Sequence, residues 1–463
     1  MKHLSTTDNN CGVSLDKLEA SNNDYENLSK IANISLIELI KNNSSLLLFP
    51  NMLGNNNDGI EEQTIFNMYG DSSNLSKVKL HTGNLMGYIG INNTKLRISS
   101  RFSNNDNNDY FLQYLLQKVF SINLFDFKYS MSLNGELELL FFIFPFLLKK
   151  ALSQGIFKTY QTFRRNDSCI KGVIDIARHI KTNVPFFGMI AYNSRERTVD
   201  NYMTQLIRHT IEYIKTKSFG KEILFYDIDT KEAVNEIIKS TNSYCLKDRN
   251  KIIFKNLKAL NHPYFTFYKS LQQLCISILT HKKIGYGNSD NKVYGILFDG
   301  AWLWEEYLAT ILKSIGFKHP KNKTEQNGIR VYRGRICYPD FYKGSQIEDI
   351  YQNNQFENNL VMDAKYKRLE NKKEDEFISR FSREDLYQLI TYMHVLPAKT
   401  GGLIYPISSN NDKTEICKSI DKNIFGLGGN ISTYGLPIPT KDKYPDFAIF
   451  MNKVENDLKK KLA

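Results

Sequence analysis

Two aspartates and a lysine in the last third of the sequence have the residue types of a hydrolytic site. Asp340 follows Pro339, and Asp363 and Lys365 lie in the apolar segment Leu360-Val-Met-Asp-Ala-Lys-Tyr. Carboxylate oxygens are the ligands that Mg²⁺ prefers in proteins, and a nearby cation can stabilise the charge that develops in a transition state. This combination favours metal-assisted hydrolysis of a phosphodiester, in which the metal activates water and neutralises charge on the phosphate.

The apolar segment around Asp363 predicts a β-strand. Side chains alternate faces along a strand, so Asp363 and Lys365 would point the same way, and two charges in a buried strand are costly unless paired or used. Residues 335–340 predict another strand, which ends at its proline with Asp340 at the exit. A hairpin through the polar loop 343–358 would bring Asp340 beside Asp363. The alternative is a surface salt bridge on an edge strand.

A helix is predicted to begin after Ser382, which forms an N-terminal capping pattern with Asp385. Its core stripe consists of Leu386, Leu389, Ile390 and Met393. At about 100° per residue, Asp385, Gln388 and Tyr392 share a different flank. That flank could be solvated, or it could line a cleft with the carboxylates. A short buried strand is predicted directly afterwards, at residues 401–406.

A helix predicted over residues 301–312 supplies a further carboxylate. Its apolar face is built from Trp304, Leu308, Ile311, Leu312 and Ile315. Helical geometry places Glu306 nearly opposite this face, where it should meet solvent, and Glu305 at its border. Glu305 is therefore the better candidate for a third metal ligand, and an ion pair on the helix surface is the alternative.

Length and composition predict a globular protein of several domains. The chain has 463 residues, and its 41% hydrophobic content can build real cores. The formal net charge of +12 favours an acidic polymer as partner, although a lysine-rich surface would give the same value. The 6 cysteines have no paired or metal-finger spacing, which predicts free thiols in a reducing cytoplasm.

The sequence contains no stretch that predicts a membrane segment. The N-terminus is polar and lacks the apolar core of a signal peptide. The most apolar stretch, residues 139–148, is about half the length of a membrane span. It contains Pro145 and predicts a buried helix or strand. We therefore expect a cytoplasmic protein without a membrane partner.

The order of elements predicts three regions and a mixed α/β fold. Residues 1–130 form a β-containing domain, residues 131–285 a mostly helical region, and residues 286–463 a mixed sheet flanked by helices. The clearest elements of the first two are strands over residues 86–91 and 95–99, joined at Asn92-Asn93, and helices over residues 110–120, 203–215 and 268–279.

The last third contains, in order, the motifs Trp304-Glu305, Pro339-Asp340, Asp363-Ala-Lys-Tyr-Lys367, Gln388-x-x-x-Tyr392 and Leu403-Ile-Tyr-Pro406. They resemble the motifs of McrC, the nuclease subunit of McrBC modification-dependent restriction systems. The Gln-x-x-x-Tyr element is shared with RecB-type nucleases. Upstream, the resemblance extends to Gly87-Tyr-Ile-Gly-Ile, Leu96-Arg-Ile-Ser-Ser-Arg-Phe102, Lys171-Gly-Val-Ile-Asp175 and Ser194 through Asn201, so that it covers about residues 85–410.

The chain departs from the McrC pattern at identifiable positions. Thr204-Gln205 stands where the family has an Asn-Arg pair, so the role of that arginine does not carry over. Before Phe102 the basic residue is Arg101 instead of lysine, which keeps the charge but changes the hydrogen-bond geometry. The first 80 residues resemble no family that we can name.

The resemblance implies a PD-(D/E)XK nuclease core in residues 286–463. Asp340 and Asp363 would ligate Mg²⁺, for which Mn²⁺ should substitute, and Glu305 would be a third metal ligand. Lys365 would stabilise charge or orient the attacking water. The catalytic set would be completed by Gln388 and Tyr392, which would support the site or a phosphate.

The resemblance also implies partners. McrC-like proteins work with McrB, an AAA+ GTPase ring that recognises modified DNA and translocates it. The chain itself has no Gly-x-x-x-x-Gly-Lys-Ser/Thr phosphate loop, so its N-terminal half would dock on the ring and stimulate GTP hydrolysis there. The basic residues Lys367, Arg368, Lys372 and Lys373 could contact the DNA backbone, or they could belong to an ordinary solvated loop.

Two other functions are compatible with these residues. One is a ring-docking GTPase activator with a vestigial nuclease site, which the intact aspartates, lysine and glutamine argue against. The other is a stand-alone restriction or repair nuclease without a GTPase. The target sequence, the modified base and the stoichiometry of the assembly cannot be predicted from these motifs.

Overall fold

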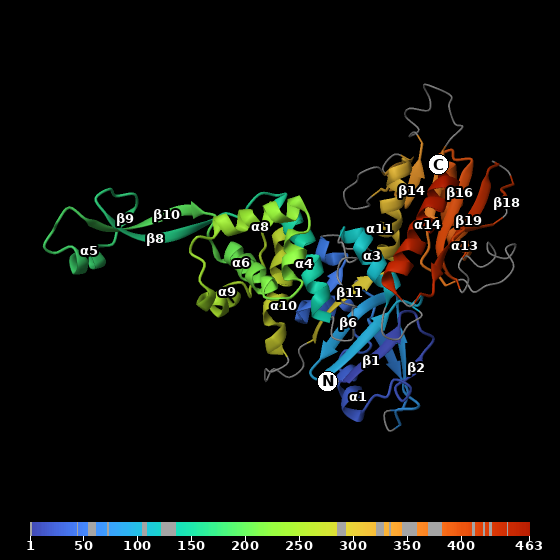
Figure 1. The fold of residues 1–463 in the computed structure, drawn as a ribbon, viewed down its shortest axis with the longest axis horizontal. Coiled ribbons are helices and arrows are strands. Elements are labelled where there is room, and N and C mark those ends of the chain that lie inside the picture. The colour runs from blue at the N-terminus through green and yellow to red at the C-terminus, as the bar shows by residue number, and fades with distance from the viewer. Residues whose placement is uncertain are drawn as a thin grey trace. The chain divides into compact units, whose positions relative to one another are not determined.

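The computed structural model describes residues 2–43, 45–53, 62–71, 74–103, 109–121, 136–284, 293–320, 328–332, 335–344, 359–368, 382–409, 413–419, 422–425, 428–441 and 443–463. The fold is mixed α/β, as the sequence predicts (Figure 1). The chain divides into two compact units, residues 1–135 with residues 289–463, and residues 136–288.

The first unit contains a five-stranded sheet with the order β1-β7-β6-β11-β3. Its strands are β1 (Lys2–Thr7), β3 (Leu46–Phe49), β6 (Leu85–Ile91), β7 (Thr94–Ser99) and β11 (Val293–Asp299). β6 and β7 form the predicted hairpin, with a turn at Asn92, whose φ is 51°. β11 lies between β6 and β3. The sequence predicts that the third region begins at residue 286, which would place β11 in that region. In the structure β11 pairs instead with β6 and β3 of the first region.

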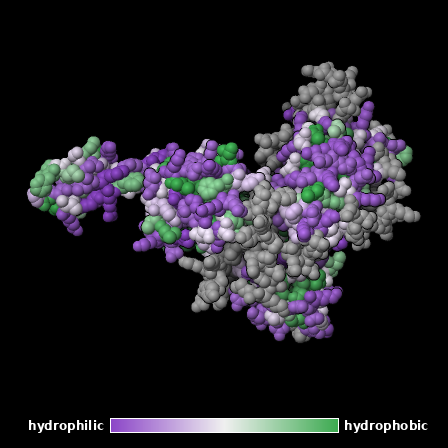
Figure 2. All heavy atoms as spheres, viewed as in Figure 1, coloured by the Kyte–Doolittle hydropathy of each residue, from purple (hydrophilic) through white to green (hydrophobic). Residues whose placement is uncertain are grey.

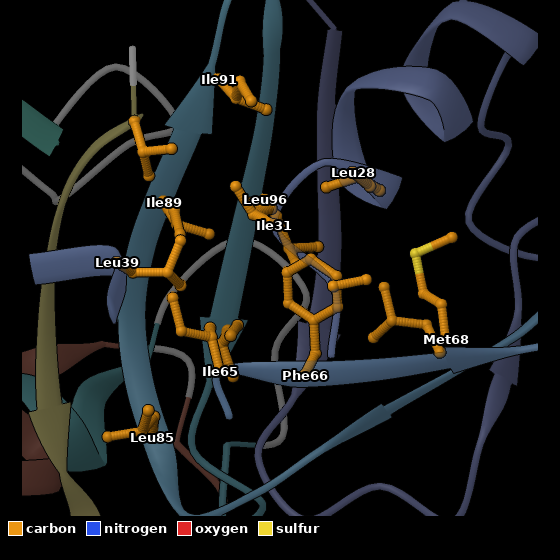
Figure 3. Close-up of a cluster of buried hydrophobic side chains, with 14 of the residues drawn as sticks. Leu28, Ile31, Leu39, Ile65, Phe66, Met68, Leu85, Ile89, Ile91 and Leu96 are labelled. Atoms are coloured by element: carbon orange, nitrogen blue, oxygen red, sulfur yellow. The ribbon is translucent and has the colours of Figure 1, made fainter. Parts of the chain in front are cut away.

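Apolar side chains and one glycine place β6 inside this sheet. Every residue of β6 is buried. Gly87 has a φ of +132°, and a Cβ there would lie 2.1 Å from the carbonyl oxygen of Ile296. Only glycine tolerates this approach of the neighbouring backbone. Figure 3 shows the adjoining core, in which Ile89 and Leu96 pack with Leu28.

Two helices and a smaller sheet complete this core. The helices are α1 (Asn22–Ser29) and α2 (Leu36–Asn42), and the sheet β2-β5-β4 consists of β2 (Val13–Ser14), β4 (Phe66–Tyr69) and β5 (Lys79–Thr82). Leu28 of α1, Leu39 of α2 and Phe66 of β4 are buried in one cluster. These elements therefore fold around the same core as β6.

A mixed sheet with the order β14-β15-β16-β19-β17 lies in the C-terminal part of this unit, and β18 also pairs with β19. Its strands are β14 (Phe341–Lys343), β15 (Leu360–Ala364), β16 (Thr400–Ser409), β17 (Cys417–Lys418), β18 (Lys422–Asn423) and β19 (Asn430–Pro439). β14 is antiparallel to β15, whereas β15, β16 and β19 are parallel. The predicted strands around Asp363 and at residues 401–406 are thus confirmed.

The helix α13 (Arg383–Val395) packs on this sheet as its sequence predicts. Ser382 and Asp385 form the predicted capping box. Leu389 and Met393 are buried with Leu403 of β16 in one cluster, and burying each such side chain contributes about 1.5–3 kcal/mol. Local patterning and core packing therefore both fix the rotation of α13, and with it the direction of its polar flank.

Glu455 joins three further helices of this unit, namely α3 (Tyr110–Phe120), α11 (Gly300–Leu312) and α14 (Tyr444–Leu462). α3 spans the predicted residues. Glu455 Oε1 accepts hydrogen bonds from the hydroxyls of Tyr114 at 2.6 Å and Tyr307 at 3.1 Å, and Oε2 accepts one from Lys118 Nζ at 2.9 Å. This buried carboxylate is satisfied by its donors, so it holds the helices in register.

A separate hairpin, β12 (Ile329–Tyr332) with β13 (Arg335–Cys337), corrects one predicted strand. The sequence predicts a strand over residues 335–340 with Asp340 at its exit. In the structure β13 ends at Cys337, and Asp340 directly precedes β14. Pro339 has no backbone N–H to donate, so it interrupts the pairing and separates the two strands.

The second unit is mainly helical, as predicted. Its helices are α4 (Glu136–Leu152), α6 (Tyr202–Lys215), α7 (Gly220–Phe225), α8 (Ile228–Ser240), α9 (Arg249–Lys255) and α10 (Phe267–Ile284). The predicted helices 203–215 and 268–279 lie within α6 and α10. Residues 139–148 lie within the helix α4 and include Pro145. Among the described residues, no helix combines the length and the apolar character that crossing a membrane requires.

An arm of three strands extends from these helices within the second unit (Figure 1). It consists of β8 (Thr159–Asp167), β9 (Val173–Ile174), the helix α5 (Ile176–Thr182) and β10 (Ile190–Thr198), with the strand order β8-β10-β9. The sequence does not predict it. Residues of β8 are exposed or half-buried throughout, so the strand lacks the alternation of buried and polar residues from which strands are recognised.

Candidate active site

The hairpin of β14 and β15 brings Asp340 and Asp363 together. Phe341 pairs with Met362, so Asp340 and Asp363 are the next residues along the two strands. The backbone N–H of Ala364 donates to Asp340 Oδ2 at 2.7 Å. Asp363 is fully buried, with 0% of its surface exposed. The two carboxylates therefore occupy one site at the end of the hairpin.

Lys365 lies beside these carboxylates. Its Nζ is 2.7 Å from Asp363 Oδ2 and 3.5 Å from Asp385 Oδ1. Burial lowers the pKa of Lys365, but attraction to Asp363, Asp340 and Asp385 outweighs burial, so the pKa lies above its ordinary value. The side chain is therefore a fixed cation at neutral pH.

The polar flank of α13 faces the site. Gln388 Oε1 accepts a hydrogen bond from Lys365 Nζ at 3.1 Å, and Gln388 Nε2 donates to the Tyr392 hydroxyl at 3.0 Å. Burial raises the pKa of Tyr392, and the charges of Asp340 and Asp363 raise it further, against the Gln388 hydrogen bond. Of the two alternatives for this flank, the structure shows the one in which it lines the carboxylates.

Burial raises the pKa values of both aspartates. The pKa of Asp340 lies well above its ordinary value, first because the carboxyl is buried and then because the charges of Asp363 and Glu305 oppose ionisation. Burial also raises the pKa of Asp363, although Lys365 attracts its charged form. Ionising both carboxylates is therefore costly without a further positive charge nearby.

The oxygens of Asp363 fit a hard cation. Oδ1 accepts no hydrogen bond from the described part of the chain, and Oδ2 is paired with the Lys365 ammonium at 2.7 Å. Buried carboxylate oxygens without donors are rare unless they bind an ion or take part in chemistry. Mg²⁺ and Mn²⁺ accept such oxygens and are commonly held by one or two carboxylates plus water. Asp340 and Asp363 are the residues that would hold the ion.

Glu305 lies close enough to act on this pair electrostatically. Burial raises its pKa to about 7, and the charges of Glu306 and Asp363 add to this, while His319 lowers it. Within the described residues, no group of three or more His, Cys, Asp or Glu side chains is arranged to hold a metal. The assignment of Glu305 as a third ligand therefore remains a proposal.

Glu306 does not point to solvent, which corrects the expectation from helical geometry. Its side chain is 19% exposed, compared with 33% for Glu305. Both carboxylates lie 3.7 Å from His319 Nε2. Most residues of α11 are buried around its circumference, so the helix has no fully solvated face, and a two-sided helical pattern does not describe it.

His319 was not found by sequence reasoning. Its ring lies between the carboxylates of α11 and the hairpin: Nδ1 is 2.8 Å from the carbonyl oxygen of Asp340, and the ring stacks on Phe341 at 5.0 Å. An isolated bridge between Lys318 and Tyr342 holds it there. A single histidine after a helix carries no sequence pattern, so only the tertiary contact identifies it.

The basic residues near the site are only partly described. Lys367 Nζ forms an ion pair with Asp385, so its charge is already neutralised within the site. Arg368 is exposed at the end of the described segment. Lys372 and Lys373 lie outside the described residues. DNA contact by these side chains remains a prediction.

Comparisons with known proteins identify the family. The model of the McrBC 5-methylcytosine restriction system component family matches residues 80–406. No curated protein matches the chain. A chain in the refined half-complex from the tetradecameric assembly of Thermococcus gammatolerans McrB AAA+ hexamers with bound McrC is 12% identical, with a TM-score of 0.51 over 99% of this chain and 100% of that chain. This likeness indicates a shared fold.

A chain from the cryo-EM structure of the Thermococcus gammatolerans McrBC complex is 11% identical, with a TM-score of 0.31, and the match covers 68% of this chain and 88% of that chain. The family model spans well over half of the present sequence, and it includes every candidate site residue from Glu305 to Tyr392. The chain therefore belongs to the family of McrBC 5-methylcytosine restriction system components.

Proposed function

We propose that the chain is the DNA-cleaving subunit of an McrBC-type restriction system and that it hydrolyses phosphodiester bonds with Mg²⁺. The observation that carries this proposal is the Asp363 carboxylate, which is fully buried beside Asp340 and is paired with Lys365 through Oδ2, while its Oδ1 accepts no hydrogen bond from the described residues. Such a group costs stability unless it is used. A vestigial site would gain stability by losing it.

Asp340 and Asp363 would hold the metal, and Mn²⁺ should replace Mg²⁺. When bound, the ion supplies an activated water and a positive charge against the phosphate. The raised pKa of Lys365 keeps its ammonium protonated, so Lys365 can hold a phosphate oxygen or orient the attacking water. Gln388 fixes the Lys365 ammonium, and Tyr392 in turn fixes the Gln388 amide.

DNA containing 5-methylcytosine is the substrate that we propose. The family description names that base, and the net charge of +12 suits a polyanion. Contacts of basic side chains with phosphates bind without reading sequence. We therefore assign backbone binding to this chain and recognition of the modified base to its partner.

The arm of the second unit is the surface that we propose for docking the partner. Large apolar side chains gather on it and are exposed, namely Tyr160, Ile170, Val173, Ile174, Ile176, Ile180, Val184, Phe186, Phe187 and Met189. Phe187 is 84% exposed and Val173 is 77% exposed. Figure 2 shows hydrophobic residues at the tip of the arm. Exposed apolar groups of this extent mark protein interaction sites.

An McrB-like AAA+ GTPase ring is the partner that we propose for this arm. The similar Thermococcus gammatolerans chain comes from an assembly of McrB AAA+ hexamers with bound McrC. The present sequence lacks a phosphate-binding loop, so the nucleotide site would belong to the ring. Docking of the arm would stimulate GTP hydrolysis, and the ring would deliver DNA to Asp340 and Asp363.

The test is GTP-dependent cleavage of methylated and unmethylated plasmids by the purified chain together with its AAA+ partner. We expect double-strand cleavage of methylated DNA that needs GTP, the partner and Mg²⁺. Asp363→Ala should abolish cleavage. Asp446→Ala is the matched control, because Asp446 is an exposed aspartate at the start of α14 in the same unit.

Two results would contradict the proposal. Cleavage by Asp363→Ala at the wild-type rate would remove the candidate site from the reaction. GTP stimulation without any cleavage by the wild-type chain, with Mg²⁺ and Mn²⁺ both supplied, would favour the activator with a vestigial nuclease site.

A further inference from the structure

Tyr366 lies beyond the end of β15 and is buried against the five-stranded sheet. It follows Lys365 directly, yet only 5% of its surface is exposed. Its hydroxyl lies 3.0 Å from Ser100 Oγ, just after β7, and 3.5 Å from Met86 Sδ on β6. The rings of Tyr366 and Phe102 form a T-shaped pair with centroids 5.5 Å apart. The neighbour of the site lysine is therefore held by elements of the five-stranded sheet.

Arg101 covers the face of the same tyrosine. Its guanidinium carbon lies 4.6 Å from the centre of the Tyr366 ring. Arg101 Nε and Nη2 donate to Asp8 Oδ2 at 2.9 and 2.6 Å, and Nη2 also donates to Asn84 Oδ1 at 2.5 Å. These contacts use the planar fork of the guanidinium, which lysine cannot reproduce.

The Arg101–Asp8 ion pair is buried, where apolar side chains would stabilise the fold more. The side chains of Arg101 and Asp8 are 6% and 0% exposed. Burial raises the pKa of Asp8 despite the hydrogen bonds and charge of Arg101. A buried ion pair contributes little net stability compared with well-packed apolar side chains. The contribution of this ion pair is that it orients the Arg101 guanidinium over the Tyr366 ring.

The position of Lys365 is fixed by contacts on both sides. On one side, its backbone N–H donates to the carbonyl oxygen of Ile404 on β16 at 2.9 Å. On the other, the next residue is clamped by Arg101 and Ser100. Consecutive Cα atoms are about 3.8 Å apart, so a shift of the Tyr366 backbone is passed on to the backbone of Lys365, which carries the ammonium.

The first residue of α11 also packs against Tyr366. Gly300 is its first residue, and a Cβ there would lie 2.7 Å from Tyr366 Cε1. The backbone N–H of Gly300 donates to the carbonyl oxygen of Asn84 at 2.8 Å. The contact with the first sheet therefore positions both Lys365 and the helix that carries Glu305.

We propose that Arg101 and Tyr366 are positioning residues, through which the five-stranded sheet sets the location of the Lys365 ammonium. The proposal rests on the proposed nuclease function. It adds a means of regulation, because any event that shifts Arg101 relative to β15 would move Lys365 away from Asp363. Neither residue touches the reacting atoms.

The test compares Arg101→Lys with Arg97→Lys. Arg97 is a second buried arginine beside this sheet, on β7, and its guanidinium carbon lies 5.9 Å from the centre of the Tyr88 ring. Arg101→Lys should lower kcat for DNA cleavage by about 10- to 100-fold, the cost of a small misplacement of a reacting group. KM and DNA affinity should stay unchanged. Tyr366→Phe keeps the ring and should lower kcat less.

A second readout does not need cleavage. In the metal-free protein, the rate at which an amine-reactive reagent labels Lys365 is measured by mass spectrometry, with the exposed Lys453 of α14 as internal reference. Arg101→Lys should raise labelling of Lys365 several-fold and leave Lys453 unchanged. Arg97→Lys should change neither rate.

The outcomes separate this inference from the proposed function. If the wild-type chain never cuts DNA, the nuclease proposal fails, and the labelling rates still decide whether Arg101 positions Lys365. If the wild type cuts, Asp363→Ala does not, and Arg101→Lys keeps the wild-type kcat and labelling rate, the positioning role is excluded. Equal losses in Arg101→Lys and Arg97→Lys would assign the effect to general weakening of the sheet.

Discussion

Lys365 Nζ lies 2.7 Å from Asp363 Oδ2; Asp363 lies in β15, and Lys365 directly follows the last residue of that strand. The contact joins a cation of raised pKa to a buried carboxylate whose other oxygen, Oδ1, accepts no hydrogen bond from the described residues. Each group makes the charge of the other tolerable. Asp363 and Lys365 therefore act as one unit, and replacing either residue should abolish the contribution of both to catalysis.

The first prediction concerns this unit. Asp340→Ala, Asp363→Ala and Lys365→Ala should each lower the cleavage rate by at least about 10³-fold, and the double variant Asp340→Ala/Asp363→Ala should be hardly worse than either single one, because residues that act together lose their effect together. Rates are measured in single turnover with Mg²⁺ and with Mn²⁺. Losses that multiply in the double variant would show that the two aspartates act independently.

The second prediction concerns the stability of the metal-free protein. The pKa of Asp340 is raised in the folded state, so the folded state binds more protons than the unfolded one, and stability falls as pH rises from about 4 through the raised pKa. Asp340→Asn keeps an acceptor for the Ala364 N–H but removes the charge. It should therefore raise Tm by about 1–2 °C at pH 8, the effect of roughly 1 kcal/mol on a folding unit of this size.

The pH dependence provides the control for this prediction. At pH 4 the wild-type carboxyl is protonated, so the wild type and Asp340→Asn should melt together. Saturating Mn²⁺ should reverse the order at pH 8, because only the wild type has both ligands and gains binding energy from the ion. A lower Tm for Asp340→Asn at pH 8 without metal would show that the charge of Asp340 does not destabilise the folded state, which would contradict this prediction.

Local signals predicted the parts of the site that lie close together in the sequence. Asp363 and Lys365 alternate within one apolar segment, and the Ser382–Asp385 capping pattern fixes where α13 begins. The core stripe then fixes which flank of α13 faces the sheet. Each inference spans only a few residues, over which backbone geometry determines direction.

Contacts between distant segments could not be predicted in this way. Tyr366 and Ser100 are 266 positions apart, and nothing in either segment indicates the other. β11 joins the five-stranded sheet, although the chain that follows it forms the mixed sheet β14-β15-β16-β19-β17. The arm carries apolar residues that remain exposed, so the periodicity that identifies buried strands is missing. Such features depend on tertiary structure or on a partner.

The third prediction concerns the two glutamates of α11. The charge of Glu305 raises the pKa of Asp340, so Glu305→Gln should change the metal affinity and lower cleavage by about 10-fold, within the usual range for groups surrounding a metal site. Glu306→Gln should have a smaller effect, although both side chains lie near His319. Equal and negligible effects of the two substitutions would show that α11 does not act on the carboxylate pair.

The fourth prediction assigns partner docking to the arm, independently of cleavage. A fragment of residues 1–285 is not a suitable test, because it lacks β11, which lies between β6 and β3. The full-length double variant Phe186→Ser/Phe187→Ser should instead lose stimulation of the partner's GTP hydrolysis. Each exposed aromatic anchor of an interface can contribute about 2 kcal/mol or more, so the affinity should fall at least about 30-fold.

The arm prediction has a matched control in the same unit. Phe254 on α9 is 71% exposed and lies outside the arm, so Phe254→Ser should leave stimulation intact. Full-length Asp363→Ala should stimulate GTP hydrolysis like the wild type and cut no DNA. GTP turnover is measured at several concentrations of each variant, and circular dichroism verifies folding. Undiminished stimulation by Phe186→Ser/Phe187→Ser, or an equal loss in Phe254→Ser, would place the docking surface elsewhere on the chain.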